Sequence, residues 1–65
     1  MPEQQPIQLL NEADSARYIG MSRDWLRHSR AHRTGPTYLR IGRAIRYTVQ
    51  DLDKFLETRR VKHSR

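Results

Sequence analysis

Cysteine is absent from all 65 residues, so neither a disulfide nor a thiolate metal site can stabilise the fold. The three histidines lack the spacing of a zinc site, and we expect no metal and no other cofactor. The sequence also lacks paired carboxylates, a nucleophile with a matching base, and a phosphate-binding loop. These absences predict a protein that is not an enzyme and binds no small-molecule ligand.

Long apolar stretches are missing as well. The longest apolar runs are two or three residues, which excludes a membrane span. The largely polar residues 1–8 do not form the hydrophobic core of a secretion signal. We therefore expect a cytoplasmic protein without a membrane partner.

Acidic residues are missing from the segment between Trp25 and Gln50, which nevertheless carries six arginines: Arg27, Arg30, Arg33, Arg40, Arg43 and Arg46. Residues 1–24 hold four acids and two bases, and residues 51–65 hold three acids and five bases. The middle segment thus accounts for the whole net charge of +6. Such a concentration of positive charge indicates a polyanionic partner, and double-stranded DNA is the leading candidate.

Residues that favour helix ends divide the chain into three predicted helices. Asn11, Ser22 and Thr48 are good N-caps, so we expect helices from Asn11 to about Ile19, from Arg23 to about Arg33, and after Thr48. Gly20 should end the first helix, and its spacing to Ser22 is typical of a helix-turn-helix. The predicted inward faces are Ser15, Ala16 and Ile19 in the first helix, and Val49, Leu52, Phe55 and Leu56 in the third.

A β-hairpin is predicted between the second and third helices. Thr34–Pro36 should break the helix, and residues 38–41 and 45–47 then alternate around a loop at Gly42–Ala44. In this register Ile41 faces Ile45, Leu39 faces Tyr47, and Arg40 faces Arg46 on the opposite side. Because like charges across a hairpin destabilise it, the two arginines indicate a nearby anion such as phosphate.

These elements predict one domain that is mainly α-helical with a small β-hairpin, arranged as a winged helix-turn-helix. We expect a flexible leader over residues 1–8, the DNA-binding domain over residues 9–59, and a basic tail over residues 60–65.

The second helix is the expected recognition helix, which would enter the major groove. With Leu26 as the buried anchor, Ser22, Ser29 and Arg33 fall on the inward side. The residues that then point outward are Asp24, Arg27, His28 and Ala31, and those on the flank, where phosphates would lie, are Arg23 and Arg30.

Arg27 is the best candidate for a guanine contact, worth about 1–3 kcal/mol of discrimination. Asp24 would either accept a hydrogen bond from cytosine or orient a neighbouring arginine. Arg30 and Arg33 have an equally good interpretation as residues that solvate the end of the helix. Trp25 is more typical of a core residue than of one that stacks on DNA.

The hairpin loop is the expected wing tip. Arg43 would reach into a minor groove, and Gly42 would allow close approach to the sugar-phosphate chain. Arg40 and Arg46 complete the predicted wing contacts.

Two stretches resemble the excisionase and AlpA-type DNA-binding domains. The first runs from Leu9 to Ser22 and has the Leu-Leu, N-cap, small-residue pair and Leu-Gly-Val-Ser-like turn of those domains. The second comprises Thr34-Gly35-Pro36, the stretch Arg40–Tyr47 and the stretch Asp51–Leu56, which match the Gly-Pro, arginine-rich wing and Asp-Leu…Phe/Trp-Leu closing helix in order and spacing. The resemblance covers residues 9 to about 60.

The resemblance implies a fold similar to the MerR-type winged helices and a protein without catalysis. It implies a recombination directionality factor that binds repeated sites in an attachment region, bends DNA and directs an integrase toward excision. Its expected partners are double-stranded DNA, the integrase, and further copies of itself bound head to tail.

The sequence departs from the family at two places. Many relatives have a tryptophan late in the recognition helix, where this chain has Ser29. No long dimerisation helix follows residue 56, which favours a short accessory factor over an effector-sensing MerR regulator.

Two other functions remain open at this point. The first is a small prophage or mobile-element transcription regulator of the AlpA type, with the same domain and a promoter as its target. The second is a basic RNA-binding or protein-interaction module, which would show no preference for duplex DNA and little dependence on Arg27.

Overall fold

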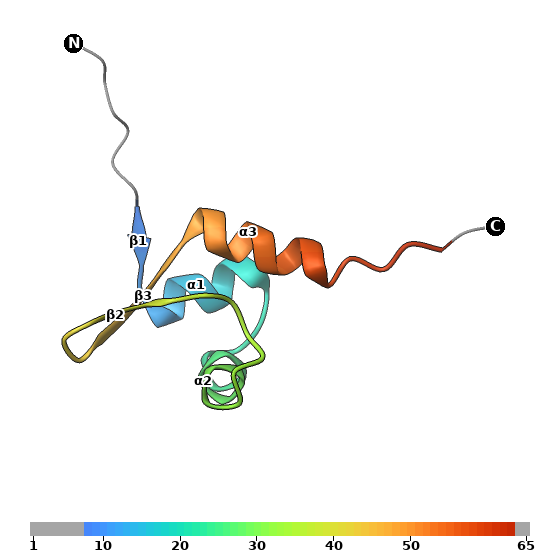
Figure 1. Ribbon diagram of the computed structural model, residues 1–65. Coiled ribbons are helices and arrows are strands. Elements are labelled where there is room, and N and C mark those ends of the chain that lie inside the picture. Colours follow the sequence, from blue (N-terminus) through green and yellow to red (C-terminus); the bar gives the residue numbers. More distant parts are fainter. Residues whose placement is uncertain (1–7, 64–65) are drawn as a thin grey trace, which may run out of the picture.

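The computed structural model describes residues 8–63, which form three helices and a three-stranded antiparallel sheet (Figure 1). Apart from Gln8, the predicted leader lies outside the described residues, as do residues 64 and 65 of the predicted tail. Along the chain the elements are β1 (Leu9–Leu10), α1 (Glu12–Ile19), α2 (Arg23–Ala31), β2 (Leu39–Ile41), β3 (Ala44–Thr48) and α3 (Val49–Thr58). Within the described part, no helix is long and apolar enough to cross a membrane.

The helices begin where the N-cap residues predict. The side chains of Asn11, Ser22 and Thr48 each accept a hydrogen bond from the backbone N–H three residues later, at 2.8, 3.0 and 3.1 Å respectively. Each of these bonds satisfies a donor that a helix leaves free at its first turn. Gly20 ends α1 with a φ of 74°, in the left-handed region that glycine tolerates best.

The predicted end of α2 is wrong by two residues. The helix ends at Ala31, and Arg33 takes a φ of 60° instead of continuing it. The N–H of Thr34 then bonds to the carbonyl of Ser29 at 2.9 Å, which closes the helix end. Arg33 is consequently exposed rather than inward-facing, and Ser22 is also exposed because it caps the helix.

The predicted hairpin register is also wrong. The turn contains only Gly42 and Arg43, with Gly42 at a φ of 62°, so Ala44 already belongs to β3. The observed pairs are Leu39 with Arg46, Arg40 with Ile45, and Ile41 with Ala44. A shift of one residue in one strand changes which side chains share a face.

Arg40 and Arg46 therefore do not face each other. The prediction of an anion that offsets their repulsion is wrong. Leu39 and Ile41 lie on the outer face of the sheet, with 39% and 54% of their surface exposed, instead of joining Tyr47 in the core. Tyr47 instead lies opposite Leu10, because β1 also pairs with β3, and sequence reasoning did not predict this pairing.

The core lies between the helices and one face of the sheet. Its fully enclosed members are Ala16, Leu26, Tyr47 and Leu52, with Leu10, Ile19, Trp25, Tyr38 and Ile45 packed around them. Ser15 and Ala16 are buried, as predicted for the inward face of α1. In α3, Leu52 is buried but Leu56 is 38% exposed, so the predicted apolar stripe is narrower than expected.

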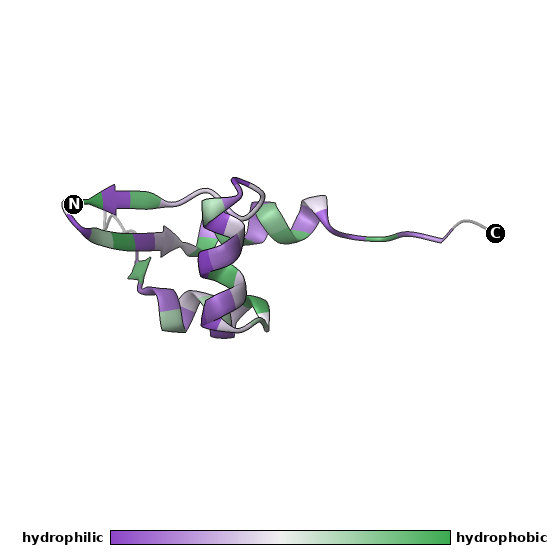
Figure 2. Ribbon diagram, turned by 90° about the horizontal axis from the view of Figure 1, so that it is seen from below, coloured by the Kyte–Doolittle hydropathy of each residue, from purple (hydrophilic) through white to green (hydrophobic). Residues whose placement is uncertain are grey.

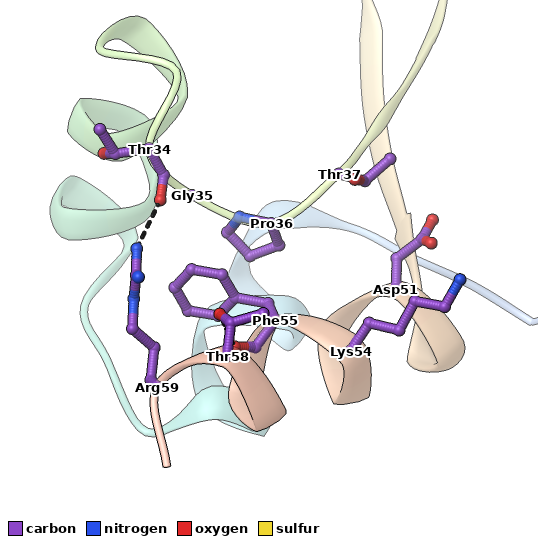
Figure 3. A pocket seen from close by; sticks show the side chains of 9 residues that line it. All are labelled: Thr34, Gly35, Pro36, Thr37, Asp51, Lys54, Phe55, Thr58 and Arg59. Carbon is purple, nitrogen blue, oxygen red and sulfur yellow. Dashed lines mark hydrogen bonds between the residues drawn. The ribbon is translucent and has the colours of Figure 1, made fainter. Parts of the chain in front are cut away.

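The loop between α2 and β2 is fixed against α3. Arg59 donates a hydrogen bond to the carbonyl of Thr34 at 2.9 Å, and its guanidinium lies 4.7 Å from the centre of the Phe55 ring (Figure 3). Pro36 is buried above the same ring. These contacts hold α2 and the hairpin in a defined relation to α3.

Candidate nucleic-acid interface

The outward face of α2 is the one that helical spacing predicts. Asp24, Arg27, His28 and Ala31 are all exposed, and together they line a shallow hollow of about 370 Å³. Leu26, the predicted anchor, is fully buried on the opposite side. Figure 2 shows that hydrophilic residues predominate along this helix.

A second hollow, of about 470 Å³, lies where α2, the start of α1 and the hairpin meet. We call it the arginine hollow, because its charged lining residues are Arg23, Arg27 and Arg30 from α2, Arg43 and Arg46 from the hairpin, and Glu12 from α1. The structure thus brings arginines from two separate elements to one surface. Arg40 and Arg33 are exposed but do not line this hollow.

Among residues 8–63, Glu12 is the one acidic residue that lines the arginine hollow. Its carboxylate lies 3.1 Å from Arg30 Nη1, 3.4 Å from Arg27 Nη2 and 3.6 Å from Arg23 Nη2. Sequence reasoning did not single it out, since an acid directly after an N-cap is ordinary for a helix start. Its partners are 11 to 18 residues away in the chain, so no local pattern signals the cluster.

The environment of Glu12 lowers the pKa of its carboxyl group. Burial by itself raises this pKa, but the hydrogen bonds and charges of Arg30 and Arg27 outweigh that effect. Glu12 is therefore ionised at neutral pH and offsets part of the positive charge in the hollow.

Arg27 is held between two carboxylates. Its Nη1 lies 3.3 Å from Asp24 and its Nη2 lies 3.4 Å from Glu12, while half of its side chain remains exposed. Of the two predicted roles for Asp24, the geometry displays the second, orientation of a neighbouring arginine. The two ion pairs consequently restrict the orientation of the Arg27 guanidinium.

Arg30 has a different environment from Arg27. Only 17% of its side chain is exposed, and Nη1 donates to the hydroxyl of Tyr47 at 3.0 Å. Its guanidinium also lies 5.7 Å from the centre of the Tyr38 ring. Arg30 therefore connects the arginine hollow to the core from its position in the last turn of α2, and it is far less exposed than Arg27.

The other predicted site residues are placed as follows. Gly42 and Arg43 form the exposed tip of the hairpin, and Arg46 Nη1 donates to the carbonyl of Ile45 at 2.8 Å. Trp25 packs edge-on against Phe55 with ring centres 6.0 Å apart, which agrees with its interpretation as a core residue.

Comparison with protein-family models and with curated proteins finds no match for this sequence. The arrangement of arginines on α2 and the hairpin is therefore the basis for a functional proposal.

Proposed function

We propose that this protein is a sequence-specific double-stranded DNA-binding protein. The observation that carries the proposal is the arginine hollow, where cationic side chains from a helix and from a hairpin border one surface. Arginines that two elements gather on one surface form the basic patch that is typical of nucleic-acid binding, whereas scattered surface charge does not.

In this proposal the fold acts as a winged helix-turn-helix. The short connection between α1 and α2 supports α2 as the recognition helix, with Arg27, Asp24 and His28 facing the bases of the major groove. The β2–β3 turn acts as the wing, where Arg43 would enter the neighbouring minor groove. Arg23 and Arg46 line the same hollow and would contact phosphates.

The more specific proposal is an excisionase-type accessory factor, and it rests on the resemblance of residues 9 to about 60 to that family. Such a protein would bind repeated sites in an attachment region beside other copies of itself, bend the DNA and direct an integrase toward excision. A transcription regulator of the AlpA type uses the same domain on a promoter, and the pattern of site occupancy separates the two roles.

A binding titration with two matched arginine variants tests the proposal. Arg27 and Arg17 are both exposed helical arginines that pair with an aspartate three residues earlier, at 3.3 and 3.1 Å. Fluorescence anisotropy would compare Arg27→Ala, Arg17→Ala and wild type on a duplex selected from a random pool and on random duplex DNA. We expect Arg27→Ala to lose about 1–3 kcal/mol on the selected duplex with little change on random DNA, because a bidentate base contact is lost.

Arg17→Ala should bind both duplexes like wild type, since it lies on the exposed surface of α1 away from the arginine hollow. Equal losses on both duplexes for Arg27→Ala would reduce Arg27 to a phosphate contact. A wild-type protein with no preference for duplex DNA over RNA or heparin would overturn the proposal. A cooperative ladder of complexes on attachment-site DNA would support the excisionase role, whereas one discrete complex on promoter DNA would support the regulator.

A further inference from the structure

Glu12 is the most enclosed of the four described acidic residues that pair with arginines. Its side chain is 16% exposed, whereas the side chains of Asp14, Asp24 and Glu57, which also pair with arginines, are 53%, 90% and 64% exposed. Carboxylates are rarely enclosed to this degree unless they are paired. This one is placed in the hollow that the proposed function assigns to DNA.

Three arginines from successive turns of α2 converge on Glu12. Arg30, Arg27 and Arg23 approach its two oxygens at 3.1, 3.4 and 3.6 Å. Carboxylates and phosphates accept hydrogen bonds from the same guanidinium N–H groups, so the carboxylate stands where a phosphate oxygen would be bound. In the protein without DNA, these donors are already engaged.

We propose that Glu12 is a specificity-determining residue of the DNA interface, an internal carboxylate that disfavours phosphate contacts of any sequence while it orients Arg27 toward the bases. The inference rests on the proposed function and deepens it. It assigns to an acidic residue a second source of selectivity, which adds to the base contact proposed for Arg27.

The two effects of Glu12 act on different kinds of DNA. Its negative charge repels the backbone of every duplex, and its hold on Arg23 and Arg27 must be loosened before these form phosphate contacts, so random DNA binds more weakly. The orientation of Arg27, in contrast, favours only a duplex with the correct base in reach. Glu12 thereby raises the ratio of the affinity for the correct duplex to the affinity for random duplex, while it lowers the affinity for duplex DNA in general.

The test compares Glu12→Gln with Glu57→Gln. Both substitutions keep the shape of the side chain and raise the net charge by the same amount, and Glu57 pairs with Arg60 at the far end of α3, outside the arginine hollow. Anisotropy titrations would use a random duplex and a duplex selected by the wild-type protein, between about 50 and about 200 mM salt. Circular dichroism would establish that each variant is folded.

We expect Glu12→Gln to bind random duplex about five- to tenfold more tightly than Glu57→Gln does, with a salt slope steeper by about 0.9 for each phosphate gained. The preference for the selected duplex should fall by about fivefold or more. If Glu12→Gln and Glu57→Gln bind both duplexes alike while wild type retains its preference, the inference fails and the proposed function stands. If wild type binds no duplex with preference, the proposed function itself fails.

Glu12→Asp provides a second variant that keeps the charge and shortens the side chain by one methylene. We expect it to bind random duplex within about twofold of wild type, because the repulsion is retained. It should bind the selected duplex more weakly, because the carboxylate no longer spans the distance to Arg27. If Glu12→Asp binds both duplexes as tightly as wild type does, Glu12 does not orient Arg27. This test holds even if Glu12→Gln fails to fold.

Discussion

At the scale of single residues, Arg30 joins the charged surface to the core. One nitrogen, Nη1, lies 3.1 Å from the carboxylate of Glu12 and 3.0 Å from the hydroxyl of Tyr47, whose ring is fully buried. Loss of either partner leaves a largely buried guanidinium with fewer hydrogen bonds. This loss lowers the free energy of unfolding. A change at Glu12 therefore has an effect on stability as well as on charge.

The lowered pKa of Glu12 makes this stabilisation depend on pH. A carboxyl group whose pKa is lower in the folded than in the unfolded protein stabilises the fold fully above the unfolded value, about 4.3, and loses this effect as pH falls through the folded value. We expect the free energy of unfolding of Glu12→Gln to be about 1 kcal/mol lower than that of wild type at neutral pH. Thermal melts of both proteins from about pH 7 to about pH 3 should show this difference shrinking below about pH 4.3.

The other acidic residues are the same in both proteins, so the comparison isolates Glu12. Glu57→Gln is the control, and it should differ little from wild type at neutral pH because its ion pair with Arg60 is exposed. A difference between wild type and Glu12→Gln that stays constant over the whole pH range would contradict the role of ionised Glu12.

At the scale of elements, Gly35 sets the distance between α2 and the loop that follows it. A Cβ at this position would collide with the Oγ of Ser29 and lie 2.9 Å from its Cβ. Ser29 is itself buried, with its hydroxyl donating to the carbonyl of Leu26 at 2.9 Å, so it has little freedom to move. The same close approach leaves no room for a tryptophan at position 29.

We expect Gly35→Ala to lower the free energy of unfolding by about 1–3 kcal/mol, because it overpacks this contact. Urea denaturation would measure the loss. In combination with Ser29→Ala the loss should be less than the sum of the two single effects, since the hydroxyl that collides is removed. If the two losses in free energy of unfolding are strictly additive, the strain in Gly35→Ala does not arise from its contact with Ser29.

Local and non-local interactions explain which elements could be predicted from the sequence. Asn11, Ser22 and Thr48 predict the helix starts correctly because a cap acts over three residues. The hairpin register follows from the two-residue turn at Gly42 and Arg43, which the alternation of residue types does not encode. The pairing of β3 with the distant β1 is a tertiary contact that no local pattern signals.

The same division applies to the candidate site. Helical spacing predicts the exposed face with Arg27 and His28, because it depends only on the geometry of α2. The pairing of Glu12 with Arg30, and of Arg30 with Tyr47, arises only when α1, α2 and β3 pack together. These tertiary contacts are the part of the site that sequence could not provide.

At the scale of the whole molecule, the hairpin and the C-terminal segment extend in opposite directions (Figure 1). Arg43 at the hairpin tip and Arg60 after α3 therefore carry the same charge at opposite ends. If DNA lies on α2 and the hairpin, only the first of these arginines is within its reach. Net charge alone would make the two equivalent.

We expect Arg43→Ala to weaken binding to selected and random duplex alike, and to make the log–log salt dependence shallower by about 0.9. Loss of one cationic contact between the wing and the duplex gives this result. Arg60→Ala removes the same charge and should leave the slope unchanged. Equal slopes for Arg43→Ala and wild type would remove the hairpin tip from the interface.

The cluster of Glu12 and its three arginines also has a consequence for how this chain responds to selection. Variants selected from a library for the highest affinity for DNA should carry a neutral residue in place of Glu12. Variants selected for thermal stability should retain Glu12. Position 12 is thus a point where two evolutionary pressures diverge, and repeated laboratory evolution from this sequence should record which of them is applied.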